Sequence, residues 1–169
     1  MDVCLLQETY LRKGDDAKFQ EIKDRGWEIH SAPRKQRIGG GVAVVYRADL
    51  GVKASVHKSF STFESIEATL GNATELIRLV NIYRPPYSKK APFTQSQFLA
   101  EFSGYLEDIS NKVGKAVVMG DFNFHMERPT EFYPRKLQEL LDDSGLLQVV
   151  PIEPTHTHGG TLDLVIMGA

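Results

Sequence analysis

Lys115-Ala-Val-Val-Met-Gly-Asp-Phe-Asn-Phe124 contains a short uncharged run that ends at a glycine and is followed at once by an acid and an amide. Unbroken apolar residues from Ala116 to Met119 are typical of a strand covered on both faces in an α/β protein. Side chains that follow such a strand emerge at the edge of the sheet, where α/β proteins commonly bind ligands. The segment therefore predicts a buried central strand with polar chemistry at its end.

Asp121 and Asn123 lie two residues apart, directly after this predicted strand. If the chain stays extended, both side chains point the same way, because strand side chains alternate with a period of two. A carboxylate is a hard oxygen ligand suited to Mg²⁺, and a carboxamide can both donate and accept hydrogen bonds. The pair suits a metal-assisted phosphate site, but it is equally typical of a polar turn closed by an Asx side chain.

The residues before this strand predict a layered α/β arrangement. Residues 63–70 and 76–83 read as an antiparallel hairpin around Gly71-Asn72. Thr94 and Gln97 resemble a capping box, and apolar residues at helical spacing then predict a helix over residues 95–112. A strand, a helix and a second strand in succession indicate a mixed sheet covered by helices.

Further elements are predicted on both sides of this unit. Apolar or alternating runs predict strands over residues 3–6, 27–31, 42–46, 146–150 and 161–167, and helical spacing predicts helices over residues 15–25 and 134–143. Gly39-Gly40-Gly41 lacks the lysine and hydroxyl residue of a phosphate-binding loop, so we interpret it as a turn with closely packed glycine.

Length and composition indicate one soluble domain. The chain has 169 residues, of which 41% are apolar and 25% charged, as in ordinary globular proteins. No run approaches the ~18 apolar residues of a membrane-spanning helix, and no signal peptide is recognised, so we expect no membrane contact and an intracellular protein. Cys4, the single cysteine, is expected to be a buried core thiol.

The charge balance gives no overall attraction for nucleic acid. Formal net charge is −2, so any contact with a polyanion has to be local. Arg34-Lys35-Gln36-Arg37 and Lys89-Lys90 are the candidate basic segments. Short runs of this kind are also typical of solvated surface loops.

Four motifs occur in a recognisable order. They are Leu6-Gln7-Glu8-Thr9, Val80-Asn81-Ile82-Tyr83-Arg84-Pro85-Pro86, Gly120-Asp121-Phe122-Asn123, and Thr155-His156 through Gly160-Thr161-Leu162-Asp163-Leu164. Together they resemble the endonuclease/exonuclease/phosphatase superfamily, and the second and fourth are most similar to the endonuclease domain of non-LTR (LINE-type) retrotransposons. The resemblance spans nearly the whole chain and implies a DNase I-like fold of the α/β (α+β) class, a two-sheet sandwich of mixed strands flanked by helices.

The resemblance also implies roles for individual residues. Glu8 matches the carboxylate that binds the catalytic divalent metal, and Asp121 matches the acid that positions or deprotonates the attacking water beside that metal. Asn123 and Tyr83 match residues that bind the scissile phosphate. Asp163 matches an aspartate that orients a catalytic histidine. Hard oxygen ligands indicate Mg²⁺ or Mn²⁺ and argue against zinc.

Other polar residues near these motifs allow two interpretations. Arg84 follows Tyr83 and its guanidinium suits a substrate phosphate, although an aromatic residue and an arginine can also cap a sheet edge. His125 lies two residues beyond Asn123 and is left out of the catalytic set. His156 and His158 lack a third nearby ligand, so a structural zinc site is not expected.

The sequence departs from the family at both ends. The family has an earlier strand that ends in an active-site asparagine and a final strand with a Ser-Asp-His motif, whose histidine the residue matching Asp163 would orient. Neither is found in residues 1–169. We therefore expect a single domain over residues 1–169 that lacks its first strand and its C-terminal Ser-Asp-His strand.

The function that follows is Mg²⁺-dependent hydrolysis of a phosphodiester, most simply the nicking of DNA by a retrotransposon-derived endonuclease. DNA is the expected partner, and a nuclear location is expected if the protein acts on DNA. Two alternatives stay open: a phosphatase of the same superfamily acting on lipid or inositol phosphates, and a non-catalytic remnant of a mobile element. The sequence does not indicate an oligomeric state.

Overall fold

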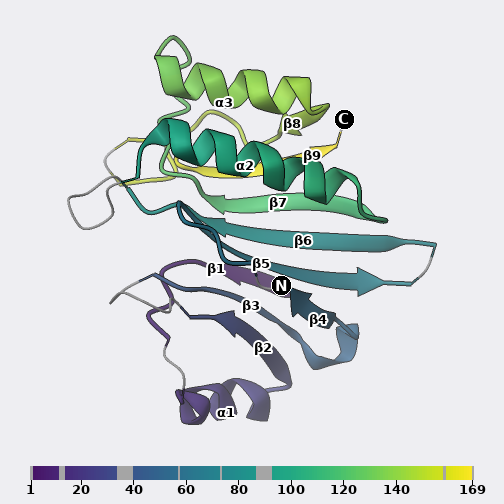
Figure 1. Ribbon diagram of the computed structural model, residues 1–169. Helices are drawn as coiled ribbons and strands as arrows, with labels where there is room; N and C mark the ends of the chain where they lie inside the picture. The colour runs from purple at the N-terminus through teal and green to yellow at the C-terminus, as the bar shows by residue number, and fades with distance from the viewer. Residues whose placement is uncertain are drawn as a thin grey trace.

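A computed structural model describes residues 2–11, 14–33, 40–56, 58–72, 74–86, 93–157 and 159–168. Within these residues, two sheets are stacked face to face and helices lie on the two outer surfaces (Figure 1). The expected sandwich of mixed strands is confirmed. The basic segments at 34–37 and 89–90, together with Gly39 and His158, lie outside the described residues.

The smaller sheet has the strand order β1-β3-β2 and is antiparallel. Its strands are β1 (Val3–Leu6), β2 (Trp27–Ala32) and β3 (Val42–Arg47). Helix α1 (Asp16–Asp24) contacts β2 and covers the outside of this sheet. Cys4 is only partly buried, because β1 is an edge strand, so the expectation of a fully buried thiol is corrected.

The larger sheet has the order β4-β5-β6-β7-β9-β8. Its strands are β4 (Lys53–Val56), β5 (Glu64–Gly71), β6 (Leu76–Tyr83), β7 (Lys115–Asp121), β8 (Leu146–Gln148) and β9 (Asp163–Gly168). The predicted hairpin of β5 and β6 is confirmed, and β6 and β7 are parallel. β4 and a short 3₁₀ helix, Ala48–Leu50, were not predicted.

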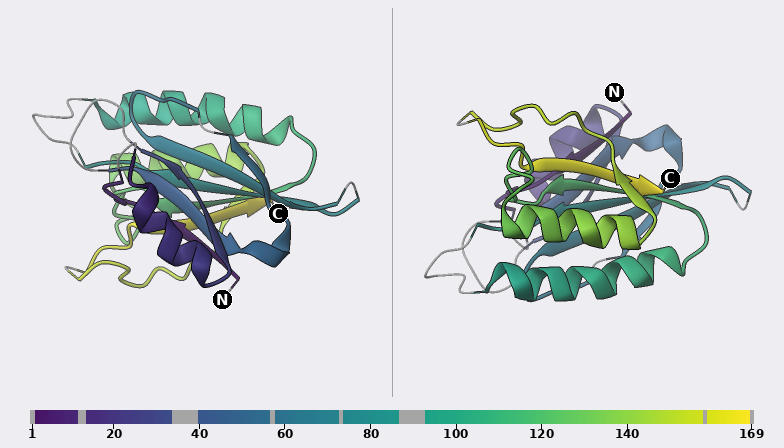
Figure 2. Two further views of the ribbon diagram at one scale, coloured as in Figure 1. Left: turned by 90° about the horizontal axis from the view of Figure 1, so that it is seen from below. Right: turned by 90° about the horizontal axis from the view of Figure 1, so that it is seen from above.

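Two helices lie side by side on the outer face of the larger sheet (Figure 2). α2 (Gln95–Ser110) begins with the predicted capping box, in which Thr94 Oγ1 accepts from Gln97 N at 3.1 Å and Gln97 Oε1 accepts from Thr94 N at 2.7 Å. α3 (Phe132–Asp143) starts two residues before Pro134, the predicted first residue. Pro134 is tolerated there because N–H groups in the first turn have no partner within the helix.

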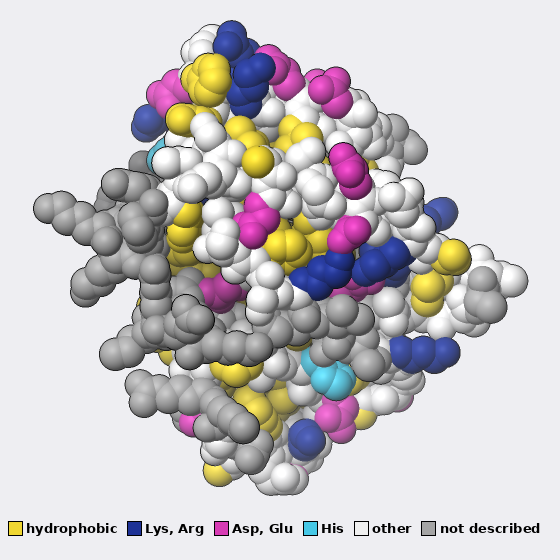
Figure 3. Space-filling view, in the orientation of Figure 1, with side chains coloured by type: hydrophobic (Ala, Val, Ile, Leu, Met, Phe, Trp, Pro, Cys, Tyr) yellow, Lys and Arg dark blue, Asp and Glu magenta, His cyan; other side chains and the backbone are white. Residues whose placement is uncertain are grey.

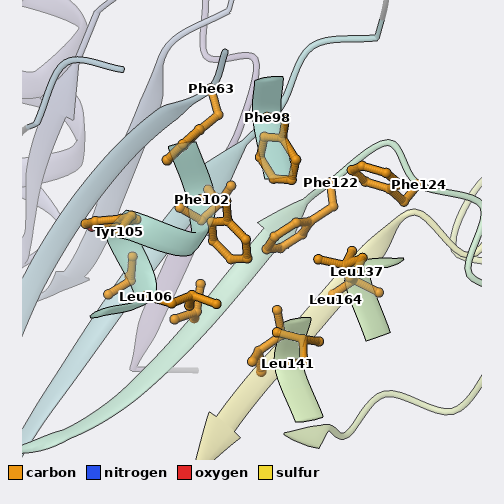
Figure 4. Close-up of a cluster of buried hydrophobic side chains, with 14 of the residues drawn as sticks. Phe63, Phe98, Phe102, Tyr105, Leu106, Phe122, Phe124, Leu137, Leu141 and Leu164 are labelled. Carbon is orange, nitrogen blue, oxygen red and sulfur yellow. The ribbon is translucent and has the colours of Figure 1, made fainter. Parts of the chain in front are cut away.

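An aromatic core lies between these helices and the larger sheet (Figure 4). Phe98 and Phe102 of α2 stack at 5.2 Å between ring centroids, and the Phe122 ring meets Phe102 edge-on at 5.4 Å. Phe122 and Phe124 are almost fully buried in this core. Because these two rings are directed into the core, they anchor the turn that carries Asp121 and Asn123.

Polar side chains are also buried on this face. Arg78 Nε donates to Glu67 Oε1 at 2.8 Å, and Arg78 Nη1 donates to the Ile109 carbonyl at the end of α2 at 2.7 Å. Lys112 reaches the other oxygen of Glu67 at 2.9 Å. Polar side chains that alternate along a strand usually face solvent. Both faces of the larger sheet are covered here, so these side chains form ion pairs with one another instead.

The smaller sheet covers only part of the larger one. Ala68 on β5 is fully buried between the sheets. The residues paired with Ala68 across the sheet are, in turn, Leu79, Val117, Met167 and Leu147. Met167 on β9 is 40% exposed and Leu147 on β8 is 49% exposed. The inner face of the larger sheet is therefore buried under β3 and exposed to solvent toward β9 and β8.

The outer surface is mixed in charge. On the face shown in Figure 3, acidic and basic side chains are interspersed over α3, whereas α2 carries acidic side chains and no basic ones. Within the described part of the chain, no helix combines the length and the apolar character needed to cross a membrane.

Candidate active site

One level of the larger sheet carries a row of polar side chains. Glu64 on β5 is paired with Tyr83 on β6, and Tyr83 is in turn paired with Asp121 on β7. Asp121 is directly opposite Asp163 on β9. Directly opposed residues point to the same face of a sheet, so we define Glu64, Tyr83, Asp121 and Asp163 as the polar row. Tyr83 is buried, Asp121 half-buried and Asp163 exposed, so the row opens to solvent at β9.

Glu8 joins this row from the other sheet. It follows β1 with a φ of 49°, an uncommon conformation for a residue other than glycine. Its carboxylate Oε1 accepts a hydrogen bond from the Tyr83 hydroxyl. The predicted metal-binding acid is thus held against the polar row by a tyrosine that was predicted to bind phosphate.

A buried amide fixes the turn that carries Glu8. Asn81 is fully buried, and its Nδ2 donates to the carbonyls of Leu6 on β1 at 2.9 Å and Ala43 on β3 at 3.0 Å. Its Oδ1 accepts from Gln7 Nε2 at 2.5 Å. Asn81 therefore connects the two sheets one residue away from Glu8. The motif containing Asn81 was recognised in the sequence, but no role was predicted for it.

Gly41 closes the row at β5. Its N–H donates to Glu64 Oε2 at 2.5 Å and its carbonyl accepts from Thr9 N at 3.2 Å. Gly41 has a φ of 90°, and a Cβ there would lie 2.7 Å from Thr9 Oγ1. The expectation of a closely packed glycine is confirmed at this position.

Asp121 and Asn123 form a tight polar turn. Asp121 Oδ1 accepts from the Asn123 N–H at 2.9 Å, and Oδ2 accepts from Asn123 Nδ2 at 3.0 Å. Nδ2 also donates to the Arg84 carbonyl at 2.7 Å, and Asn123 has a φ of 51°. The Asx-turn interpretation is confirmed as local geometry, and the same turn fixes the direction of the carboxylate at the rim.

The pKa of Asp121 lies well above its ordinary value, at about 6. Burial is the largest cause, because it penalises the charged carboxylate. The hydrogen bonds from Asn123 oppose this effect, whereas the negative charges of Asp163 and Glu8 raise the pKa further. Negative charge is therefore concentrated at this end of the sandwich.

Arg84 is buried and not exposed at the site, and its predicted contact with substrate stays a prediction. Its side chain is 2% exposed, and Nη1 donates to the carbonyls of Phe122 at 2.8 Å and Asn123 at 3.1 Å. The guanidinium lies over the rings of Phe124 and Phe98, at 4.4 and 5.4 Å from their centroids. Burial lowers its pKa to about 10. Arg84 supports the Asp121 turn from behind.

Asp163 also differs from its prediction. It was expected within an apolar strand, but it is the first residue of β9 and its side chain is exposed. Its N–H, like that of Leu162, donates to Thr155 Oγ1, at 3.1 and 3.0 Å respectively. Thr155 thus fixes the entry into β9 and keeps Asp163 opposite Asp121.

The oxygen-rich end of the sandwich fits a hard divalent cation with few protein ligands. No set of three or more His, Cys, Asp or Glu side chains converges on one point among the residues described, so a closed protein cage is not formed there. Mg²⁺ characteristically binds through one or two carboxylates and keeps several waters. Glu8 and Asp121, whose charges already influence each other, are suited to such a site.

The Endonuclease/Exonuclease/phosphatase family profile matches residues 1–169. Among solved structures, the human Nocturnin catalytic domain with bound sulfate has a TM-score of 0.71 at 17% identity, covering 99% of this chain and 69% of that one. The endonuclease domain of TRAS1, a telomere-specific non-LTR retrotransposon, has a TM-score of 0.66 at 15% identity, with coverages of 98% and 71%. The 3′ phosphatase NExo from Neisseria, bound to a product DNA hairpin, has a TM-score of 0.63 at 19% identity, covering 99% of this chain and 76% of that one.

These structural similarities show a shared DNase I-like fold. No curated protein matches this sequence significantly. Because the family profile covers the whole chain and the fold agrees with it, this chain belongs to the endonuclease/exonuclease/phosphatase family.

Proposed function

We propose that this protein hydrolyses a phosphodiester bond in DNA with the help of Mg²⁺ or Mn²⁺, and so nicks one strand. Family members are hydrolases. The observation that carries the proposal is that Glu8 is hydrogen-bonded to Tyr83, which is paired with Asp121 in the polar row. A retrotransposon endonuclease and a DNA-bound 3′ phosphatase among the similar structures support a nucleic-acid substrate.

Glu8 and Asp121 are the residues that would hold the ion. When bound, it would polarise the phosphoryl oxygen and lower the pKa of a coordinated water. Glu8 is oriented for this task by the Tyr83 hydroxyl, and Asp121 by the Asn123 N–H.

The other proposed roles concern the attacking water and the phosphate. Asp121 positions the attacking water and accepts its proton, with the Asn123 hydrogen bonds fixing the direction of the carboxylate. Asn123 and Tyr83 are the proposed phosphate contacts: the Asn123 carboxamide would turn to the phosphate while its backbone N–H keeps Asp121 oriented, and the Tyr83 hydroxyl would stay beside Glu8 and meet the phosphate there. Asp163 is exposed beside Asp121, where it can orient an imidazole as the family resemblance implies.

A plasmid-nicking assay tests the proposal. With Mg²⁺, supercoiled DNA should relax to the nicked form, and EDTA should stop the reaction. Asp121→Ala should lower the rate by on the order of 10²–10³, as expected for loss of a main group at the reacting centre. Asp143→Ala removes an exposed acid at the end of α3 and is the matched control. Nicking that persists in Asp121→Ala or in EDTA would refute this site.

The same assay separates the two alternatives. The 3′ phosphatase NExo and ANGEL2, a 2′,3′-cyclic phosphatase, are both structurally similar to this chain. Release of inorganic phosphate from a small ester, an inositol phosphate or a 3′-phosphorylated oligonucleotide, without nicking of plasmid, would favour a phosphatase. A folded protein that turns over none of these substrates would favour a non-catalytic remnant.

A further inference from the structure

An imidazole and a carboxylate form a pair just beyond Asn123. His125 Nδ1 and Glu127 Oε1 are 2.7 Å apart, and Glu127 Oε2 accepts from Thr161 N at 2.9 Å. Both carboxylate oxygens are thereby held, so the ring is held as well. The His125 side chain is 46% exposed, and Arg128 Nε lies 3.4 Å from the same Glu127 oxygen. The charges at this rim are mixed, on a chain whose net charge is negative.

The backbone places this pair at the rim of the candidate site. Phe122 N donates to the Leu162 carbonyl at 2.9 Å, and Met126 N donates to the Thr161 carbonyl at 3.3 Å. The turn after β7 therefore runs along the segment that leads into Asp163. His125 is two residues from Asn123, so their Cα atoms are at most about 7 Å apart.

Gly160 provides the space in which the ring lies. A Cβ at position 160 would be 3.1 Å from His125 Nδ1 and 3.2 Å from Cε1, closer than side chains normally approach. A methyl group there would shift the half-exposed imidazole toward solvent by a few tenths of an ångström, and it would also meet Leu162 Cδ2 at 3.2 Å. The present position of His125 thus depends on the glycine beneath it and the carboxylate beside it.

We propose that His125 contacts a DNA phosphate next to the scissile one, a role that rests on the proposed function. Nδ1 is engaged by Glu127, and no described residue is hydrogen-bonded to Nε2. In the imidazolium form, Nε2–H points outward as a donor, and an approaching phosphate favours this form. His125 would then supply a positive group that holds DNA at the acidic site.

DNA binding without metal tests this contact directly. Binding of a short fluorescein-labelled duplex is measured by anisotropy in EDTA at mildly acidic pH. His125→Ala should weaken binding roughly tenfold, as for a hydrogen bond to a charged group. It should also reduce the slope of log K against log salt by about one, the signature of a lost phosphate contact. Arg135→Ala, which removes an exposed cation on α3, should leave the slope unchanged.

Gly160→Ala is an independent probe, because it displaces the ring without removing it. It should weaken binding in the same direction as His125→Ala, and it should have little further effect in the His125→Ala background. Circular dichroism and urea unfolding confirm that each variant is folded. Additive effects of the two substitutions, or an unchanged salt slope in His125→Ala, would overturn the proposal.

The outcome is separable from that of the nicking assay. If the protein binds DNA through His125 but does not nick, the contact stands and the proposed function fails. If the protein nicks DNA and His125→Ala binds and cuts as the wild type does, the contact is refuted and the function stands. A wild-type protein that does not bind the duplex at all would refute the contact.

Discussion

Asp121 and Asp163 are directly opposite each other on β7 and β9, so two carboxylates share one level of the sheet. Their mutual repulsion contributes to the raised pKa of Asp121, after the larger effect of burial. Asp163→Asn should therefore lower the pKa of Asp121 from about 6, while burial keeps it above the ordinary value. A ¹³C NMR titration of the carboxyl carbon in EDTA measures it, with Asp143→Asn as control. An unchanged pKa would mean that the two acids do not face each other.

The same raised pKa predicts how stability depends on pH. Asp121 is protonated in the folded and unfolded states below the ordinary pKa of 3.8, and it is charged in both above about 6. Between these values the folded state binds the proton more tightly, so the free energy of unfolding falls as pH rises. In EDTA, Asp121→Asn should gain stability over the wild type across this range, up to roughly 3 kcal/mol at 1.36 kcal/mol per pH unit. Loss of a hydrogen bond from Asn123 reduces the gain. Urea unfolding of both proteins from about pH 4 to 7 measures the difference. A difference in the free energy of unfolding that does not change with pH would contradict this prediction.

Most of the framework could be predicted because local patterns and packing agree. The uncharged run before Gly120 is a central strand, and the Thr94 capping box starts α2 as predicted. The order of four motifs identified the family, and the polar row then follows from strand register. The strand and the capped helix depend on near neighbours in the sequence, which a single chain reveals.

Other features depend on what covers each face, which the sequence pattern does not specify. The burial of Arg78 and Arg84 was not predicted, because a charged residue in or just after a strand normally indicates exposure to solvent. Asn81 reads as a polar break in an apolar strand, yet it is the hydrogen-bonded link between the sheets. The His125–Glu127 pair needed the position of Gly160, 35 residues away, to be recognised.

Tyr83 is expected to act on the metal through Glu8. Tyr83→Phe removes only the hydroxyl that donates to Glu8, so the carboxylate loses its orientation while the ring still packs. Affinity for Mn²⁺ or Mg²⁺, measured by calorimetry, should fall roughly tenfold, as for other residues that orient a metal ligand. Tyr46→Phe is the matched control, because its hydroxyl bonds His30 at 2.7 Å in the same inter-sheet core. Equal losses in both variants would indicate general loosening of the core.

Arg84 gives the sharpest contrast between a binding role and a supporting role. If it bound substrate, Arg84→Met would raise KM and leave folding unaffected. Its guanidinium instead bonds the carbonyls of Phe122 and Asn123 and lies against two aromatic rings. Arg84→Met should therefore cost about 2–4 kcal/mol in urea unfolding, from unpaired carbonyls and lost cation–π contact.

The effect on activity should follow from the same contacts. Asp121 and Asn123 would lose the group that holds their turn, so kcat should fall more than KM rises. Arg84→Lys keeps the charge but not the planar fork, and it should resemble Arg84→Met more than the wild type. A stable Arg84→Met protein with raised KM alone would place the guanidinium in contact with substrate, against the burial seen here. Because stability and kinetics are measured on the same two variants, together they decide whether Arg84 binds substrate or supports the turn.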